Sequence, residues 1–261
     1  MTDSCYAERD GRIFTVTINR PERMNALHPP GNAEMAELFD EFQNDPDLWV
    51  AIVTGAGDRA FSAGNDLRYQ AEGGDRSAMP ESGFGGLTSR WDLDKPVIAA
   101  VNGVAMGGGF EIALACDMII ASENARMALP EPKVGLAALA AGVHRLPRQI
   151  GLKRAMGMML TGRHVLAQEG YELGFVTAVA PEGEALSEAR RWAEMILECS
   201  PMSIRATKQA AMQGLDQTGV RAAHEGKYEA VKAMSKSEDY IEGPVAFAAV
   251  SYTHLTLPTK A

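Results

Sequence analysis

At 261 residues, 46% of them apolar, the chain is long enough for one packed domain with a helical appendage and too apolar for intrinsic disorder. A formal net charge of −9 and the lack of a basic stripe argue against a general nucleic-acid-binding protein, although a small anionic ligand needs only a few local cations. The three cysteines are far apart and form no CxxC pair, which is typical of reduced thiols and not of a disulfide framework or zinc site.

The first 180 residues alternate between short β-branched runs and helical patterns. A helix is expected from Pro30 to just before Pro46, and three glycines at 107–109 open an apolar helix that ends at Cys116. Residues 70–86 form a loop rich in glycine and polar residues. This alternation favours parallel strand pairing with right-handed crossovers. Strands are expected over residues 13–18, 49–54, 96–101 and 117–121.

From about residue 141 the pattern changes to successive helices, with one strand-like run over 175–179. The last three helical stretches cover residues 184–199, 201–215 and 220–234. We therefore expect an α/β core over residues 1–180 and a helical region over 181–249, of the kind that often forms oligomer contacts.

The sequence offers no membrane segment. The N-terminus carries several charged residues instead of a signal peptide, and the most apolar stretch, 104–121, is interrupted by Glu111 and Asp117. A cytoplasmic protein without a membrane or nucleic-acid partner is expected.

Three glycines precede a carboxylate in the motif Gly107-Gly108-Gly109-Phe110-Glu111. Glycines at a helix start leave backbone N–H groups unpaired and accessible, and with the helix dipole behind them these donors suit a developing oxyanion. Glu111 is surrounded by apolar residues, so it should be buried, and a buried carboxylate is costly unless it is paired or functional. A structural salt bridge to an arginine and a catalytic role explain this feature equally well.

Two further motifs add an amide-rich turn and a second acid. Residues 61–67 are Phe-Ser-Ala-Gly-Asn-Asp-Leu, whose small residues let backbone amides face a ligand, although such loops are common. Glu131 lies between Pro130 and Pro132, which fix the backbone around it, although a solvated turn explains this motif alone more simply. Taken together, the motifs fit acid/base chemistry beside a polarised carbonyl. The five histidines show no metal-ligand spacing.

Several motifs in succession resemble those of the enoyl-CoA hydratase/isomerase superfamily, whose fold is named after crotonase. The likeness extends to about residue 249, and Gly83 to Thr88 together with Phe110 most resemble carnitinyl-CoA dehydratases. The motifs are Asn19-Arg20-Pro21 with Asn25-Ala26-Leu27, Phe61 to Leu67, Lys95 to Gly103, Gly107 to Glu111 with Cys116-Asp117, Leu129-Pro130-Glu131, and residues 237–247.

This resemblance implies an α/β fold, with a crotonase-like ββα spiral core and a helical C-terminal region that builds a homotrimer or a dimer of trimers. It implies an acyl-CoA substrate, catalytic roles for Glu111 and Glu131, and an oxyanion hole made by the amides of Asn65 and Gly108. The implied reaction is hydration or dehydration at the 2,3 double bond, with no metal and no cofactor beyond the CoA of the substrate. The residues implied in substrate or CoA binding are Arg23, Ala63, Asp66, Leu67, Arg68 and Gly107.

Three alternative functions stay open: an enoyl-CoA isomerase, a carnitinyl-CoA dehydratase of the same fold, and a catalytically silent scaffold subunit. The presence of both acids counts against the scaffold. After Glu131 the family usually has a proline and a Gly-Gly pair, where this chain reads Leu-Ala-Ala-Leu-Ala-Ala-Gly over 136–142. Leu139 replaces the acid of the dehydratases in this stretch, which argues against a carnitine-like substrate and for an apolar acyl pocket.

The end of the chain does not resemble the family. Residues 250–261 are Val-Ser-Tyr-Thr-His-Leu-Thr-Leu-Pro-Thr-Lys-Ala, where family members have a charged tail, and they resemble a translated adapter from DNA library preparation. We predict that they are not native and that a restored basic tail would bind CoA more tightly. Resequencing the source gene with another library method tests this, and recovery of the same codons would contradict it.

Overall fold

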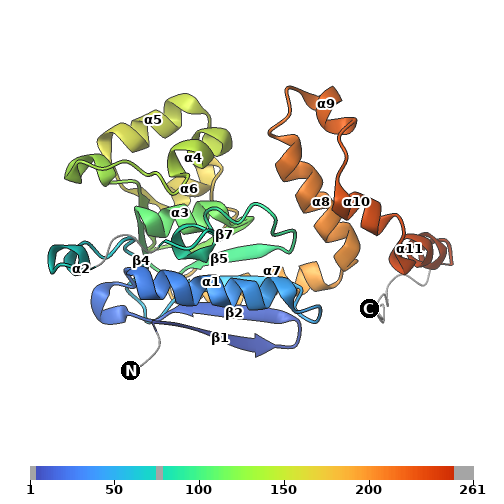
Figure 1. The fold of residues 1–261 in the computed structure, drawn as a ribbon, viewed down its shortest axis with the longest axis horizontal. Helices are drawn as coiled ribbons and strands as arrows, with labels where there is room; N and C mark the ends of the chain where they lie inside the picture. The colour runs from blue at the N-terminus through green and yellow to red at the C-terminus, as the bar shows by residue number, and fades with distance from the viewer. Residues whose placement is uncertain (1–3, 75–78, 250–261) are drawn as a thin grey trace.

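The computed structural model describes residues 4–74 and 79–249 (Figure 1). Its main sheet has six strands, with β1 antiparallel to β2 and every other neighbouring pair parallel. β2, β3 and β5 are buried along their whole length, which explains why their sequences are largely apolar, with Thr15, Thr17 and Thr54 as buried polar residues. In sheet order the strands are β1 (Cys5–Asp10), β2 (Ile13–Ile18), β3 (Val50–Gly55), β5 (Val97–Val101), β7 (Met118–Ser122) and β10 (Ala178–Ala180).

A second sheet of short strands makes the fold a spiral. β4, β6 and β8 follow β3, β5 and β7 along the chain, so that each turn places one strand in each sheet before the chain continues. The expected ββα spiral and the parallel pairing are confirmed. The short strands were not predicted, because three residues are too few for a visible periodicity. In sheet order they are β4 (Ala60–Ser62), β6 (Val104–Met106), β8 (Arg126–Ala128) and β9 (Val165–Leu166).

Helices cover both faces of the main sheet. α1 (Pro29–Asn44) and α3 (Gly108–Ala115) contribute to the large core cluster, whereas α7 (Ala185–Leu197) packs against β3 and β5 through a second, smaller cluster. The remaining α-helices are α2 (Leu67–Ala71), α4 (Gly142–Ile150), α5 (Leu152–Thr161), α6 (Ala167–Leu173), α8 (Pro201–Gly214), α9 (Val220–His224), α10 (Glu229–Met234) and α11 (Glu238–Ala248). The short 3-10 helices are η1 (Pro21–Arg23), η2 (Phe84–Gly86) and η3 (Glu131–Val134).

The C-terminal helices α8 to α11 form an arm beside the core (Figure 1). The prediction of one continuous helix over 220–234 was wrong, because α9 and α10 are separated there. The hydroxyl of Tyr228 donates to the carbonyl oxygen of Ala223 at 2.6 Å and closes the intervening turn. The division into 1–180 and 181–249 stays a prediction, and the predicted non-native segment 250–261 lies outside the described residues. No helix in the described ranges is long and apolar enough to span a membrane.

Candidate active site

The N-terminus of α3 is shaped by consecutive glycines. Gly107 has φ +53°, a region that favours glycine. A side chain at Gly109 would lie 2.1 Å from the carbonyl oxygen of Ser62, so only glycine allows α3 to pack this closely against β4. The first N–H groups of a helix have no acceptor within it, and the positive end of the helix dipole lies there. This end of α3 therefore presents backbone donors where negative charge is stabilised.

Glu111 lies one turn into α3, and 4% of the residue is exposed. Its Oε1 accepts a hydrogen bond of 2.8 Å from the backbone N–H of Gly142, the first residue of α4. Burial, together with the nearby Glu131 carboxylate, raises the pKa of Glu111 to about 7. Within the described part of the chain, no lysine or arginine lies at salt-bridge distance from Glu111. The structural salt bridge is thus excluded there, and a carboxyl group that titrates near neutral pH suits proton transfer.

Glu131 opens η3 between two prolines, and its side chain points into the protein. A Cβ atom added to Gly107 would lie 3.0 Å from Glu131 Oε1, which places this carboxylate directly beside the start of α3. Its Oε2 is buried and has no hydrogen-bond partner among the described residues, and burial raises the pKa of Glu131. A solvated turn does not explain a buried, unpartnered carboxylate oxygen, whereas a functional site does.

The backbone around Asn65 turns its amide away from Leu27. The N–H of Leu27 donates to Gly64 O and the N–H of Asp66 donates to Leu27 O, each at 2.8 Å, and Asn65 forms the β-bridge between them. Successive N–H groups along an extended chain point to opposite sides, so the Asn65 N–H faces away from Leu27.

Gly64 brings this loop against α3. A side chain at Gly64, whose φ is +87°, would lie 2.6 Å from Met106 O and 2.9 Å from the amide nitrogen of Gly108. The loop containing Asn65 and the first turn of α3 are therefore in contact. The two amides predicted for the oxyanion hole lie on adjoining segments, close to both carboxylates.

The other predicted binding residues surround the same loop. Asp66 is buried, pairs with Arg20 at 3.0 Å and accepts a hydrogen bond of 3.1 Å from the N–H of Tyr69. These contacts give Asp66 a structural role at the start of α2, which the sequence did not indicate. Binding roles for the others stay predictions: Arg23 and Ala63 are half-buried, Leu67 and Arg68 are exposed, and Gly107 is buried at the start of α3.

Sequence reasoning missed two residues of the site. Gly142 holds the Glu111 carboxylate although it lies 31 positions away, and no local pattern indicates such a contact. Phe84 packs over the start of α3, since a Cβ atom at Gly108 would lie 2.6 Å from its ring. The glycines after Phe84 were a usable signal, because Gly85 and Gly86 both have positive φ and mark a tight turn.

Because Glu111 is buried, replacing it by a neutral side chain should stabilise the fold, and the size of this gain should depend on pH. The pKa of Glu111 lies above its ordinary value, so at a pH below the unfolded-state pKa the carboxyl group is neutral in both states and does not affect stability. As pH rises from there through about 7, the free energy of unfolding falls, because the unfolded state loses its proton first. We expect Glu111→Gln to raise the free energy of unfolding at pH 8 by up to roughly 3 kcal/mol, and much less at pH 5. Denaturant unfolding at both pH values measures this, with Glu37→Gln on the exposed face of α1 as control. Equal effects of Glu111→Gln at the two pH values would contradict the prediction.

Comparison with known proteins gives a consistent result. Residues 8–252 match the enoyl-CoA hydratase/isomerase family. A carnitinyl-CoA dehydratase from Salmonella typhi is 42% identical over 252 residues, which cover 95% of this chain and 96% of that protein. The solved structure of an enoyl-CoA hydratase from Mycobacterium tuberculosis H37Rv has a TM-score of 0.88 and 35% identity, covering 95% of this chain and 96% of that one. The solved structure of a carnitinyl-CoA hydratase from Mycobacterium avium has a TM-score of 0.78 and 38% identity, covering 96% of this chain and 97% of that one.

Proposed function

The chain belongs to the enoyl-CoA hydratase/isomerase family, and we propose that it catalyses the hydration of an enoyl-CoA thioester or the reverse dehydration. Hydration adds water across the 2,3 double bond, and dehydration forms that bond. Such an enzyme is a carbon–oxygen lyase. One observation carries the proposal beyond the family: two inward-facing carboxylates, Glu111 and Glu131, meet at a helix start that presents backbone donors. An isomerase moves a proton between carbons and has no need to activate water.

The reaction follows from this geometry. The N–H groups of Asn65 and Gly108 donate to the thioester oxygen, so that negative charge arriving from the β-carbon collects as an enolate at a prepared site. Glu111 takes a proton from water as its oxygen bonds to the β-carbon, and Glu131 delivers a proton to the α-carbon. Burial and the neighbouring Glu131 carboxylate raise the pKa of Glu111, so we assign the two roles to the pair as much as to each residue. We propose that no metal and no cofactor beyond the CoA of the substrate takes part.

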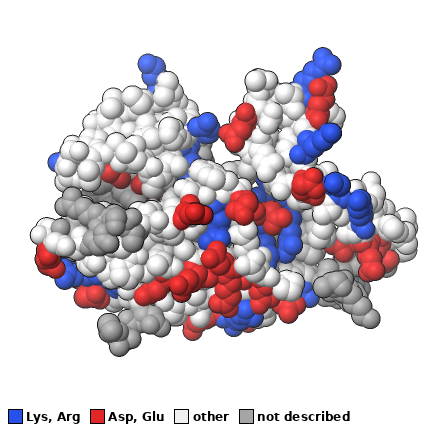
Figure 2. All heavy atoms as spheres, viewed as in Figure 1, with Lys and Arg blue, Asp and Glu red and all other residues white. Residues whose placement is uncertain are grey.

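We further propose that the enzyme works in the cytoplasm as a homotrimer or a dimer of trimers. Large apolar side chains on α11 support self-association, since α11 lies on the arm and exposes Tyr240, Ile241, Val245 and Phe247. Acidic side chains gather over the lower part of the face in Figure 2. Because such a surface repels the phosphate backbone, we propose that nucleic acid is not a partner. CoA binding near the loop of Asn65 would use Arg23 and Arg68.

A substrate comparison tests the proposed function. Incubation of the purified protein with crotonyl-CoA should consume the conjugated double bond and yield a 3-hydroxyacyl-CoA, detected by mass spectrometry as the gain of one water. A 3-enoyl-CoA serves as the isomerase substrate and should be converted slowly or not at all. Rapid isomerisation without hydration would identify an isomerase, and no turnover of either substrate would favour a scaffold subunit.

Because Asn65 is proposed to act through its backbone N–H, replacing its side chain should change the rate of hydration only slightly. The Asn65 side chain is exposed, and the donor in question is its backbone N–H, which alanine keeps. Asn65→Ala should therefore change kcat for crotonyl-CoA hydration by less than about tenfold, far below the effect of losing an oxyanion donor. Steady-state kinetics measure this. A larger loss with unchanged stability would assign the side chain to the substrate instead.

A further inference from the structure

A segment that holds none of the reacting groups supports the loop around Asn65. Residues 19–27 run along residues 62–66, which we call the oxyanion loop, and the N–H of Ala63 donates to Met24 O at 2.9 Å. The β-bridge and its two hydrogen bonds, described above, join the same two segments. The position of the Asn65 N–H therefore depends on the shape of residues 19–27.

The supporting segment contains a strained turn. Met24 and Asn25 have φ values of +53° and +55°, in the left-handed region that residues with side chains disfavour. Such a conformation persists only where the surrounding structure fixes it. Asn25 is fully buried, and its side-chain amide donates to Ala60 O at 2.7 Å. The hydroxyl of Ser62 donates to Asn25 O at 2.8 Å, so the strained turn contacts the oxyanion loop directly.

Arg20 connects this turn to the other end of the oxyanion loop. Its backbone N–H donates to Asn25 Oδ1 at 2.9 Å. Its side-chain Nη1 donates to Ala26 O and pairs with Asp66 Oδ2, the latter at 3.0 Å. Asp66 directly follows Asn65 in the chain. One guanidinium nitrogen thus ties the strained turn to the residue next to the oxyanion amide.

The Asp66 carboxylate is held through both of its oxygens. Oδ1 accepts a hydrogen bond of 3.1 Å from the N–H of Tyr69, and Oδ2 pairs with Arg20. Burial alone would raise the pKa of Asp66, but the bond from Tyr69 and the pair with Arg20 outweigh burial and hold this pKa below its ordinary value. Among the described residues, no other lysine or arginine lies at salt-bridge distance from Asp66. Because a buried charge without a partner is costly, the place of this carboxylate depends on Arg20.

We propose that Arg20 and Asp66 are positioning residues, which hold the Asn65 N–H where it meets the thioester oxygen. The inference rests on the proposed function, because it assigns that N–H to the oxyanion hole. Without Arg20, the Asp66 carboxylate regains solvation only by moving outward, and the adjoining amide moves with it. An oxyanion donor acts because it is fixed in advance, and misplacement by about 1 Å can lower the rate about 10²-fold.

Kinetics of two Arg20 variants test the inference. Arg20→Met removes the charge, and kcat for crotonyl-CoA hydration should fall about 10- to 10²-fold. The dissociation constant of butyryl-CoA should change less than about threefold, since a ground-state carbonyl gains less from the amides than an enolate does. Arg20→Lys should keep kcat within about threefold, because both side-chain bonds come from one nitrogen, which an ammonium group replaces. Equal kcat in the wild type and Arg20→Met would overturn the inference.

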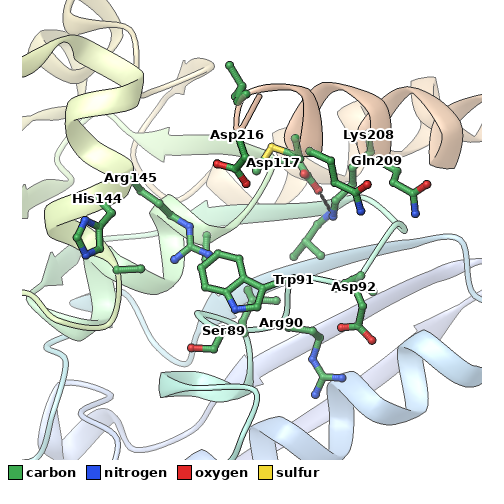
Figure 3. A pocket seen from close by; sticks show the side chains of 18 of the residues that line it. Ser89, Arg90, Trp91, Asp92, Asp117, His144, Arg145, Lys208, Gln209 and Asp216 are labelled. Atoms are coloured by element: carbon green, nitrogen blue, oxygen red, sulfur yellow. Dashed lines mark hydrogen bonds and ion pairs between the residues drawn. The ribbon is translucent and has the colours of Figure 1, made fainter. Parts of the chain in front are cut away.

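Lys208→Met is the matched control for loss of a buried ion pair. Lys208 pairs with Asp117 at 2.8 Å, and Figure 3 shows this pair on the wall of a groove beside α8. The side chains of both pairs are at most 21% exposed, so the two losses should lower the free energy of unfolding to a similar extent. If Lys208→Met lowered kcat as much as Arg20→Met, the effect would belong to stability and the inference would be wrong.

Asp66→Asn tests whether the two residues act as one unit. Asparagine keeps an oxygen for the Tyr69 N–H but removes the charge that Arg20 neutralises. Asp66→Asn should lower kcat about as much as Arg20→Met, and the double variant should be slower than either single variant by less than about threefold. Losses that multiply in the double variant would show two independent effects and contradict the inference.

A spectroscopic measurement separates failure of this inference from failure of the proposed function. Acetoacetyl-CoA has an acidic hydrogen between its two carbonyl groups, and its enolate has an ultraviolet band that the keto form lacks. The wild-type protein should raise the enolate fraction of the bound thioester even if it hydrates no enoyl-CoA, because the amides stabilise the enolate oxygen. Arg20→Met should lower this bound fraction at least about threefold, whereas Arg20→Lys and Lys208→Met should keep it. Equal bands in the wild type and Arg20→Met would overturn the inference while leaving hydration intact. The lack of a band in every variant would overturn the oxyanion hole and the positioning role together.

Discussion

Replacing Glu111 or Glu131 by glutamine is expected to lower kcat for hydration about 10²- to 10⁴-fold while the fold and CoA binding stay nearly intact. Glutamine keeps the shape of the side chain but can neither take a proton from water nor deliver one to the α-carbon. Glu111 accepts its hydrogen bond from a backbone N–H, which a glutamine oxygen can also accept, so the position of the side chain should persist.

Steady-state kinetics with crotonyl-CoA, together with the dissociation constant of butyryl-CoA, measure this prediction. Glu37→Gln is the control, since Glu37 is exposed on α1 and belongs to none of the segments that form the candidate site. If either active-site variant kept a near-normal kcat, the role assigned to that residue would be wrong. The pH profile adds an independent check: because the pKa of Glu111 is raised to about 7, wild-type activity should fall as pH drops below that value.

Gly108→Pro is expected to lower kcat for hydration at least about 10²- to 10³-fold. Gly108 is the first residue of α3, where proline is well tolerated because the missing N–H has no acceptor within the helix. The helix should therefore persist while one oxyanion donor is lost. Loss of such a donor lowers kcat about 10²- to 10³-fold in enzymes with related chemistry.

Gly108→Ala separates this effect from steric disturbance. A Cβ atom at Gly108 would lie 2.6 Å from the ring of Phe84, so alanine requires movement of Phe84 but keeps the N–H. We expect Gly108→Ala with Phe84→Ala, which removes the ring atoms that would collide with the new Cβ, to retain most of the activity. If that double variant were as inactive as Gly108→Pro, packing at this position would explain the loss and the amide would not.

The sequence alone determined the parts of this protein that local chemistry controls. The runs rich in apolar and β-branched residues predicted β2, β3, β5 and β7, since strands buried on both faces are largely apolar. Burial of Glu111 followed from its apolar neighbours, and the glycines before it predicted a helix start with accessible amides. The resemblance to the family added the two amide positions, which residue patterns alone could not identify.

Tertiary structure decided whatever depends on contacts between distant segments. The hydrogen bond from Gly142 to Glu111 joins residues 31 positions apart, and the contact of Gly64 with Gly108 joins two separate turns of the spiral. The inward orientation of Glu131 was decided in the same way, because its two prolines fix the backbone but not what lies opposite the side chain. Sequence patterns report the burial and conformation of one segment, whereas an active site requires several segments to converge, and only the packed spiral fixes which of them meet.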